Sequence, residues 1–177
     1  GLQVHLFALN GDDGSRIRQR LQTAAHALHA VAGMPHAAIA RRIRETGIDI
    51  LFDLRGWGGG GTPEVLAMRP APLQVNWLAY PGTSGAPWID YVLADAFVLP
   101  PALEPAFSET VLRLPRAFQP SDNTRVVEAP PARGECGLPG CDGNGGGVVF
   151  CCFNNSYKLN PRSVARMLEV LRGVPGS

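Results

Sequence analysis

The sequence predicts an α/β fold built around a parallel sheet, and the clearest signal lies in residues 35–54. A helical pattern over residues 35–46 is followed, after a single glycine, by the apolar segment 48–54. The middle of that segment is apolar on both faces, which is typical of a strand buried in a parallel sheet. A helix that leads directly into such a strand indicates layers of helices packed on a sheet.

The other elements of the first 119 residues are short and are bounded by turn residues. The apolar segment 2–9 ends at a turn over residues 10–14, so it is predicted to be a core strand. In the helix, Ile39 and Ile43 fall one turn apart, Pro35 suits the first turn, and Gly47 supplies a left-handed stop. Further strands are predicted at 73–78, 91–94 and 111–114.

A glycine-rich segment follows the strand 48–54 and precedes a short helix, for which Thr62 is a suitable cap and Pro63 a suitable first residue. Gly56, Gly58 and Gly61 have the spacing of a dinucleotide-binding loop, but a run of glycines fits many patterns. The lysine of a nucleoside-triphosphatase phosphate loop is absent. A loop that borders a ligand cleft is as good an interpretation as a phosphate site.

The chain changes character after residue 119. Residues 120–147 are rich in Pro, Gly, Asp and Asn and are predicted to be a linker or a long surface loop. A strand at 148–153 and a helix that Asn160 and Pro161 open are predicted to follow. That helix carries an apolar stripe that needs a sheet to pack against: Val164, Met167, Leu168, Leu171 and Val174. We therefore expect residues 1–119 to be the later part of one α/β domain and residues 148–177 the truncated first β-α unit of a second, so that the chain is a fragment.

Composition excludes several classes of function. The 177 residues are 45% hydrophobic and 18% charged with a net charge of +1, as in a soluble globular protein and unlike a nucleic-acid-binding one. Neither a membrane-spanning run nor a signal pattern is present, so a cytoplasmic setting is the default. Cys136 and Cys141 lack the spacing of a zinc site, and Cys151 and Cys152 are predicted to be small buried hydrophobes. The four histidines and the carboxylates form no catalytic triad or dyad that the sequence reveals.

Two segments offer candidate binding residues. The start of the last predicted helix is an anion site in principle, because a helix N-terminus offers N–H donors and Lys158 lies two residues before the cap. Spacing alone favours a solvated lysine over a ligand-binding one. In the segment 68–85, Trp77 and Leu78 are predicted to belong to the core, whereas Tyr80, Pro81 and Thr83 lie in a turn suited to face a sugar.

The segments RPAPLQVNWLAYPGTSG at 69–85 and FCCFNNSYKLNP at 150–161 closely resemble the O-GlcNAc transferase family, as do residues 49–54 and 90–91. The glycine-rich run after Trp57 is most similar to that of bacterial members. The resemblance implies two Rossmann-like domains of the GT-B type. It also implies inverting transfer of N-acetylglucosamine from UDP-GlcNAc to Ser or Thr hydroxyls of proteins, with no metal or other cofactor required.

The same resemblance implies roles for individual residues. Lys158 matches the lysine that contacts the donor diphosphate, and Asn155 matches a neighbouring polar position. The sugar and acceptor side of the cleft is matched by Trp57, Leu78, Ala79, Pro81 and Thr83. The family's upstream His-Pro and downstream His-Thr-Thr motifs do not occur in this sequence, so we expect the fragment alone to be inactive. The alternative is a non-catalytic nucleotide-binding or interaction module, which has no need of Lys158.

Overall fold

The structure, a computed structural model, describes residues 1–139 and 147–177, which divide into two compact units. Unit 1 comprises residues 1–121, and unit 2 comprises residues 122–177. Cys141 and most of the glycine run of the expected linker lie outside the described residues. Each unit is considered by itself below.

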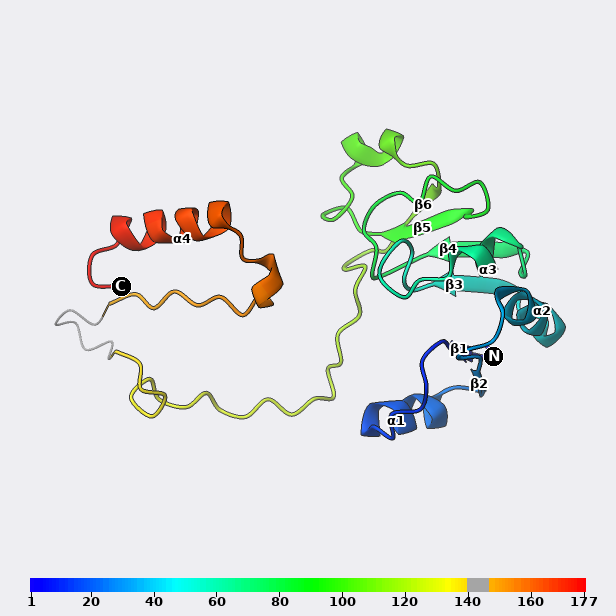
Figure 1. Ribbon diagram of the computed structural model, residues 1–177, viewed down its shortest axis with the longest axis horizontal. Helices are drawn as coiled ribbons and strands as arrows, with labels where there is room; N and C mark the ends of the chain where they lie inside the picture. The colour runs from blue at the N-terminus through cyan, green and yellow to red at the C-terminus, as the bar shows by residue number, and fades with distance from the viewer. Residues whose placement is uncertain (140–146) are drawn as a thin grey trace. The chain divides into compact units, whose positions relative to one another are not determined.

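Unit 1 alternates strands and helices, as the sequence predicts (Figure 1). Its elements in chain order are β1 (His5–Ala8), α1 (Arg16–Ala24), β2 (Ala27–Ala30), α2 (His36–Thr46), β3 (Ile50–Asp53), α3 (Pro63–Ala67), β4 (Leu73–Asn76), β5 (Tyr91–Ala94), the 3-10 helix η1 (Pro101–Ala106) and β6 (Thr110–Arg113). The predicted strands of this unit all form: β1, β3 and β4 are shorter than predicted, β5 has the predicted bounds, and β6 begins and ends one residue earlier.

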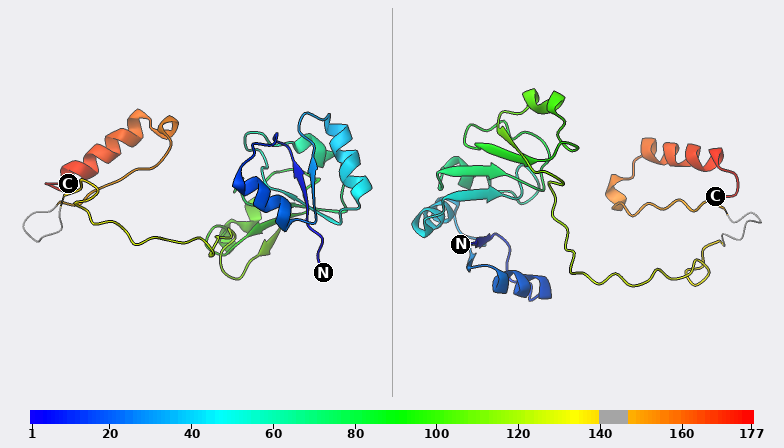
Figure 2. Two further views of the ribbon diagram at one scale, coloured as in Figure 1. Left: turned by 90° about the horizontal axis from the view of Figure 1, so that it is seen from below. Right: turned by 180° about the vertical axis from the view of Figure 1, so that it is seen from behind.

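The strands of unit 1 make two parallel sheets. β1 pairs with β2, and the other four strands pair in the order β3-β4-β5-β6. Helix α2 packs against both sheets. Its buried Ile39 and Ile43 belong to one core cluster, against which Phe7 of β1 and Leu51 of β3 also pack. In both Figure 1 and Figure 2, α1 and α2 lie on opposite sides of β1 and β2. Parallel strands with helices on both faces are the layers of a doubly wound α/β fold.

Helix α2 shows how local sequence sets this architecture. Ile39 and Ile43 are only 4% and 3% exposed, so the apolar face lies inward. Gly47 ends the helix in the left-handed conformation with φ of 73°, and the chain enters β3 three residues later. A side chain at that position would be strained, which is why glycine is the residue that allows so short a connection.

Three details of unit 1 differ from the sequence-based expectations. The sequence predicted neither α1 nor β2. Helix α1 buries none of its residues and so shows no apolar pattern; it begins at a cap in which Ser15 Oγ accepts from Arg18 N–H. The predicted burial of the strand 48–54 on both faces is wrong: Ile50 and Phe52 are 48% and 44% exposed, because β3 is the edge strand of its sheet. Thr62 occupies the N-cap position of α3 but makes no side-chain capping bond.

Unit 2 contains the short 3-10 helix η2 (Ser156–Lys158) and helix α4 (Pro161–Gly173). α4 begins as predicted: Asn160 Oδ1 accepts from Ser163 N–H at 2.9 Å, and Ser163 Oγ accepts from Asn160 N–H at 3.0 Å. The predicted strand at 148–153 is wrong, because none of the described residues pairs with this segment and a single strand cannot satisfy its own backbone. Its Cys151 and Cys152 are exposed for the same reason, contrary to the burial predicted for them.

The apolar stripe of α4 is also uncovered. Val164, Met167, Leu168 and Leu171 remain 38–43% exposed, because no strand of the described part of unit 2 lies beneath them. Within the described residues, no helix is long and apolar enough to cross a membrane.

Candidate functional site

The candidate site of unit 1 is built by two loops that leave the carboxyl ends of neighbouring strands. Asp53 ends β3 and Asn76 ends β4, and the register places these two residues side by side. The glycine loop (residues 54–62) follows β3, and the β4–β5 connection (residues 77–90) follows β4. Parallel α/β sheets bind their ligands in the loops beyond the carboxyl ends of strands, so these loops are the natural place for a site.

The glycine loop folds on its own hydrogen bonds. Asp53 Oδ1 accepts from the N–H groups of Arg55 and Gly56, each at 3.0 Å. Gly58 N–H donates to Arg55 O and Gly61 N–H donates to Gly58 O, both at 2.9 Å, while the Arg55 guanidinium donates to Gly59 O at 2.9 Å. The N–H groups of Gly56, Gly58 and Gly61 are therefore used inside the loop. The dinucleotide-like spacing of these glycines thus reflects how the loop folds and does not create a phosphate cradle.

Two of the glycines are required by close packing. A Cβ on Gly56 would lie 2.6 Å from Tyr80 Cβ, and the residue has a φ of 52°. A Cβ on Gly61 would lie 2.3 Å from Gly56 O. Both distances are too short for real contacts, so glycine at these positions lets the loop close on itself and lets the β4–β5 connection approach it.

The two loops are joined by Trp57, whose indole is about half exposed. Its Nε1–H donates to Ser84 O at 2.9 Å. Trp57 and Ser84 line one small pocket together with Asp53, Gly56, Pro63, Ala86, Trp88 and Ile89. The structure thus brings Trp57 against the β4–β5 connection.

A second pocket lies against the start of the β4–β5 connection. It is lined by Trp77, Leu78, Tyr80, Pro81, Val92, Leu93, Ala94, Val98, Leu99, Phe107 and Phe118. Leu78, two residues after the buried end of β4, has a φ of 90°, an unusual conformation for a residue with a side chain. Both Leu78 and Pro81 face this pocket, whereas Ala79 is exposed and lines neither pocket.

Asp95 closes the second pocket by fixing the segment that follows β6. Its carboxylate accepts from the N–H groups of Phe97, Val98 and Phe118 at 2.7–2.9 Å. The bonds from Val98 and Phe118 outweigh the effect of burial and hold the pKa of Asp95 below its usual value. Trp77 Nε1–H donates to Phe118 O at 2.9 Å and so ties the same segment to the end of β4.

Thr83, the weakest site candidate by resemblance, proves to be bound to a buried carboxylate. Its Oγ1–H donates to Glu109 Oε2 at 2.7 Å, and Ser84 N–H donates to Glu109 Oε1 at 2.6 Å. Glu109 lies just before β6 and is 5% exposed. Burial alone would raise the pKa of Glu109, but the hydrogen bonds from Ser84 and Thr83 outweigh it and lower that pKa. Thr83 therefore holds the loop, and its hydroxyl is not free to contact a sugar.

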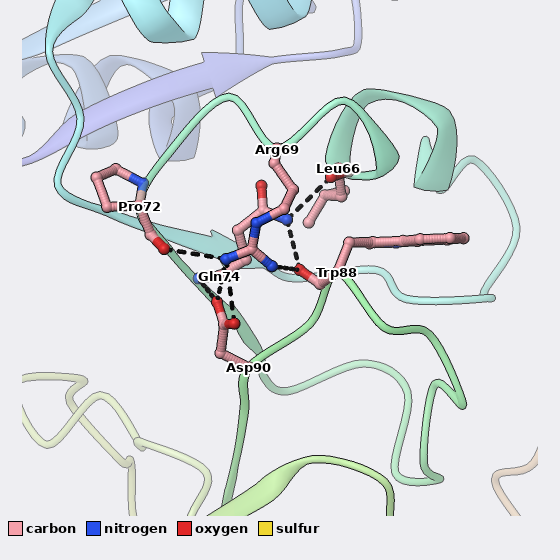
Figure 3. Close-up of polar contacts among 6 residues, drawn as sticks. All are labelled: Leu66, Arg69, Pro72, Gln74, Trp88 and Asp90. Carbon is pink, nitrogen blue, oxygen red and sulfur yellow. Dashed lines mark hydrogen bonds and ion pairs between the residues drawn. The ribbon is translucent and has the colours of Figure 1, made fainter.

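The opposite end of the β4–β5 connection is held by a network around Arg69 and Gln74 (Figure 3). The Arg69 guanidinium donates to both Asp90 carboxylate oxygens, to Trp88 O and to Pro72 O, each at 3.1 Å. Gln74 is fully buried, and its Nε2 donates to Leu66 O at 2.9 Å and to Trp88 O at 2.7 Å. Asp90 in turn accepts from Gln74 N–H at 2.8 Å.

This network explains part of the motif at 69–85. Arg69 and Gln74, which sequence analysis assigned no role, fix the ends of the connection on which Leu78, Pro81 and Thr83 are carried. Glu109 and Asp95 were missed as well. Their roles come from contacts with residues distant in sequence, and no local pattern signals them.

In unit 2, Lys158 ends η2 and is exposed, and it is the only lysine of the sequence. Asn155 caps η2 by accepting from Tyr157 N–H, and its carbonyl accepts from Lys158 N–H at 3.0 Å. The capping box of α4 uses Ser163 N–H, and Pro161 has no N–H to offer. The start of α4 therefore has fewer free N–H donors for an anion than an uncapped helix terminus has. The structure places Asn155 and Lys158 on one short turn.

The carboxylates of the site have structural work. Asp53, Asp95 and Glu109 each accept at least two hydrogen bonds from loop residues and so hold the loops in place. Among residues 1–139 and 147–177, no group of three or more His, Cys, Asp or Glu side chains is arranged to hold a metal ion.

Fold and site together define a parallel α/β protein in which loops at the carboxyl ends of the strands line small pockets, an arrangement typical of α/β enzymes. The model of glycosyl transferase family 41 matches residues 1–134. This match covers most of the chain, and the chain belongs to that family.

Relatives support the assignment along almost the whole chain. A probable UDP-N-acetylglucosamine–peptide N-acetylglucosaminyltransferase of Arabidopsis thaliana is 36% identical over 99% of this chain. The enzyme named UDP-N-acetylglucosamine–peptide N-acetylglucosaminyltransferase in Caenorhabditis elegans is 35% identical over 71% of it. A lysine-to-methionine mutant of the Thermobaculum terrenum O-GlcNAc transferase superposes with a TM-score of 0.76 over 97% of this chain at 27% identity. The chain spans 18%, 11% and 31% of the lengths of these three proteins, respectively.

Proposed function

We propose that this chain is part of an inverting glycosyltransferase of the GT-B type that transfers N-acetylglucosamine from UDP-GlcNAc to Ser or Thr hydroxyls of proteins. The observation that carries the proposal is the similarity to the Arabidopsis relative over 99% of the chain, because it extends from unit 1 into unit 2, where Lys158 lies. A non-catalytic module is the rival outcome that the experiment below separates from it.

In the proposed reaction, Lys158 contacts the diphosphate of the donor. Bond cleavage at the sugar leaves negative charge on the diphosphate, and a fixed cation beside that charge lowers the barrier. A lysine that carries the charge in this way makes a metal ion unnecessary. Asn155 shapes the turn that presents Lys158, since its side chain accepts from Tyr157 N–H and its carbonyl accepts from Lys158 N–H.

Unit 1 supplies the sugar and acceptor side in this proposal. Trp57 offers an exposed aromatic face, which suits packing against a sugar ring. Leu78 and Pro81 form an apolar wall, and Ala79 is an exposed position between them. Thr83 contributes indirectly by holding its turn in place.

In this proposal the enzyme is a bacterial-like member of the family that acts in the cytoplasm, where exposed thiols such as those of Cys136, Cys151 and Cys152 stay reduced.

The test is a chimera in which residues 1–177 replace the matching part of the Thermobaculum terrenum enzyme. We expect the chimera to transfer N-acetylglucosamine from UDP-GlcNAc to a peptide acceptor, measured by mass spectrometry, and the isolated chain to transfer none.

Lys158→Met should lower the transfer rate of the chimera by a factor of about 100 or more, as for loss of an electrostatic contact to the transition state. Arg125→Met is the matched control, since it removes one exposed cation of the same unit. Equal activity of the two variants would contradict the proposed role of Lys158, and turnover by the isolated chain would refute the expectation that it is inactive alone.

A further inference from the structure

We propose that Glu109 is a positioning residue for the sugar and acceptor side of the site: its ionised carboxylate fixes the Thr83–Ser84 turn, and the Ser84 carbonyl then fixes the indole of Trp57. We call the contacts of Glu109 with Thr83 and Ser84, together with the bond from Trp57 to Ser84 O, the latch. The latch is a property of unit 1, and only its catalytic consequence rests on the proposed function.

The first half of the latch is Thr83. Its Oγ1 accepts from Gly85 N–H and from Ser108 N–H, each at 3.2 Å. Both lone pairs of the hydroxyl are then in use, so its proton must be donated. The nearest acceptor is Glu109 Oε2 at 2.7 Å; Ser108 Oγ lies 3.1 Å away and itself donates to Oε2 at 3.2 Å.

The second half is Ser84. Its Oγ accepts from Ala86 N–H at 3.2 Å and donates to Glu109 Oε1. Its backbone N–H donates to the same oxygen at 2.6 Å. The Ser84 carbonyl points the other way and accepts from Trp57 Nε1 at 2.9 Å. One turn therefore connects a buried carboxylate of the β5–β6 connection to an aromatic side chain of the glycine loop.

The donors around Glu109 require an acceptor at both oxygens. A glutamine at position 109 has the same shape, yet one of its two terminal atoms is an NH₂ group that only donates. In one orientation this group faces the Thr83 hydroxyl, and in the other it faces Ser84 N–H. Either way one bond to the turn is lost, even where Ser108 Oγ accepts from the new NH₂ group, so Glu109→Gln is an isosteric change that breaks one side of the latch. The lowered pKa of Glu109 agrees with a carboxylate that stays ionised.

The direct test labels the chain with 5-fluorotryptophan and records its fluorine NMR spectrum. The three tryptophans give three resonances, and Trp57→Phe identifies that of Trp57. We expect Glu109→Gln to shift or broaden the Trp57 resonance and to leave that of Trp77, whose indole binds Phe118 O, in place. Glu128→Gln, at an exposed position of unit 2, is the control and should change none of the three. An unchanged Trp57 resonance in folded Glu109→Gln would overturn the proposal.

Should Glu109→Gln not fold, Thr83→Val keeps the test decisive, because it removes the Thr83 donor to Oε2, together with the acceptor for Gly85 N–H and Ser108 N–H, and leaves the bonds of Ser84 to Oε1. It should shift the Trp57 resonance in the same direction but less, and no shift would overturn the latch. In the chimera described above, Glu109→Gln should raise the KM for the peptide acceptor several-fold while Glu128→Gln does not. An unchanged KM would overturn the catalytic consequence. If the unmutated chimera transfers no sugar, the proposed function fails, whereas the fluorine spectrum still decides whether Glu109 holds Trp57.

Discussion

Replacing Gln74 by methionine tests whether the network of Figure 3 supports the site. Gln74 is fully buried, and its amide donates to Leu66 O and Trp88 O at 2.9 and 2.7 Å. Methionine has a similar length and no donor, so the change leaves two buried carbonyl groups without these partners. Each carbonyl keeps a hydrogen bond from Arg69, so each loss costs about 1 kcal/mol.

One opposing contribution reduces the cost. Gln74 Oε1 is buried with no hydrogen-bond partner, and its removal returns about 1 kcal/mol because that oxygen no longer has to be desolvated. The balance is two losses against one gain of similar size, so we expect Gln74→Met to lower the free energy of unfolding by about 1 kcal/mol. At about 3–5 °C per kcal/mol for a unit of this size, the melting temperature should fall by about 3–5 °C.

The measurement is urea and thermal unfolding of the 177-residue chain, followed by circular dichroism. Gln22→Met, at an exposed position of α1, is the matched control and should change the free energy of unfolding by less than about 0.5 kcal/mol. A Gln74→Met variant as stable as the unmutated chain would show that the two bonds to Leu66 O and Trp88 O contribute nothing, and the reasoning would be refuted.

Three further predictions follow from the same loops. Arg69→Lys should lower the free energy of unfolding by about 1 kcal/mol, because an ammonium group cannot reach Asp90 and two carbonyls together. The loss is no larger because the Arg69–Asp90 pair is partly exposed to solvent, and equal urea midpoints of the two chains would contradict this prediction. Gly61→Ala should lower the free energy of unfolding by at least about 2 kcal/mol because its Cβ would meet Gly56 O, whereas Gly59→Ala, with open space around it, should be neutral in the same unfolding assay. Because the pKa of Glu109 is lowered on folding, its ionisation stabilises the chain above the usual glutamate pKa of about 4.3, and this contribution is lost as pH falls through the lowered value. The stability difference between the unmutated chain and Glu109→Gln should therefore be constant at neutral pH and shrink in acid, and a difference that grows in acid would contradict the assignment.

The sequence was a good guide wherever local chemistry decides the structure. Gly47 ended its helix as predicted because only a left-handed residue permits so short a connection to β3. Asn160 and Pro161 opened α4 as predicted because a capping residue and a first-turn proline act within one helical turn.

The sequence was a poor guide wherever a partner decides the structure. The apolar segment 148–153 has the composition of a strand, but a strand exists only beside another, and the described residues provide none. α1 was missed because it buries no side chain and so shows no apolar stripe.

The site follows the same division. The resemblance pointed to Trp57, Leu78 and Pro81, and these do line the two pockets. Glu109, which holds the turn between them, lies 25 residues from Ser84 in sequence and leaves no local signal. The assignments of Asn155 and Lys158 to the donor diphosphate remain predictions.

The most direct test of the account is whether a donor diphosphate covers the single lysine of this sequence. The chimera is treated with a limiting amine acylating reagent, and the peptide that contains Lys158 is quantified by mass spectrometry with and without ligand. We expect UDP and UDP-GlcNAc to slow the acylation of Lys158 at least several-fold and free N-acetylglucosamine to have no effect. Acylation at the same rate with and without UDP-GlcNAc, in a chimera that transfers the sugar, would contradict the claim that Lys158 contacts the diphosphate.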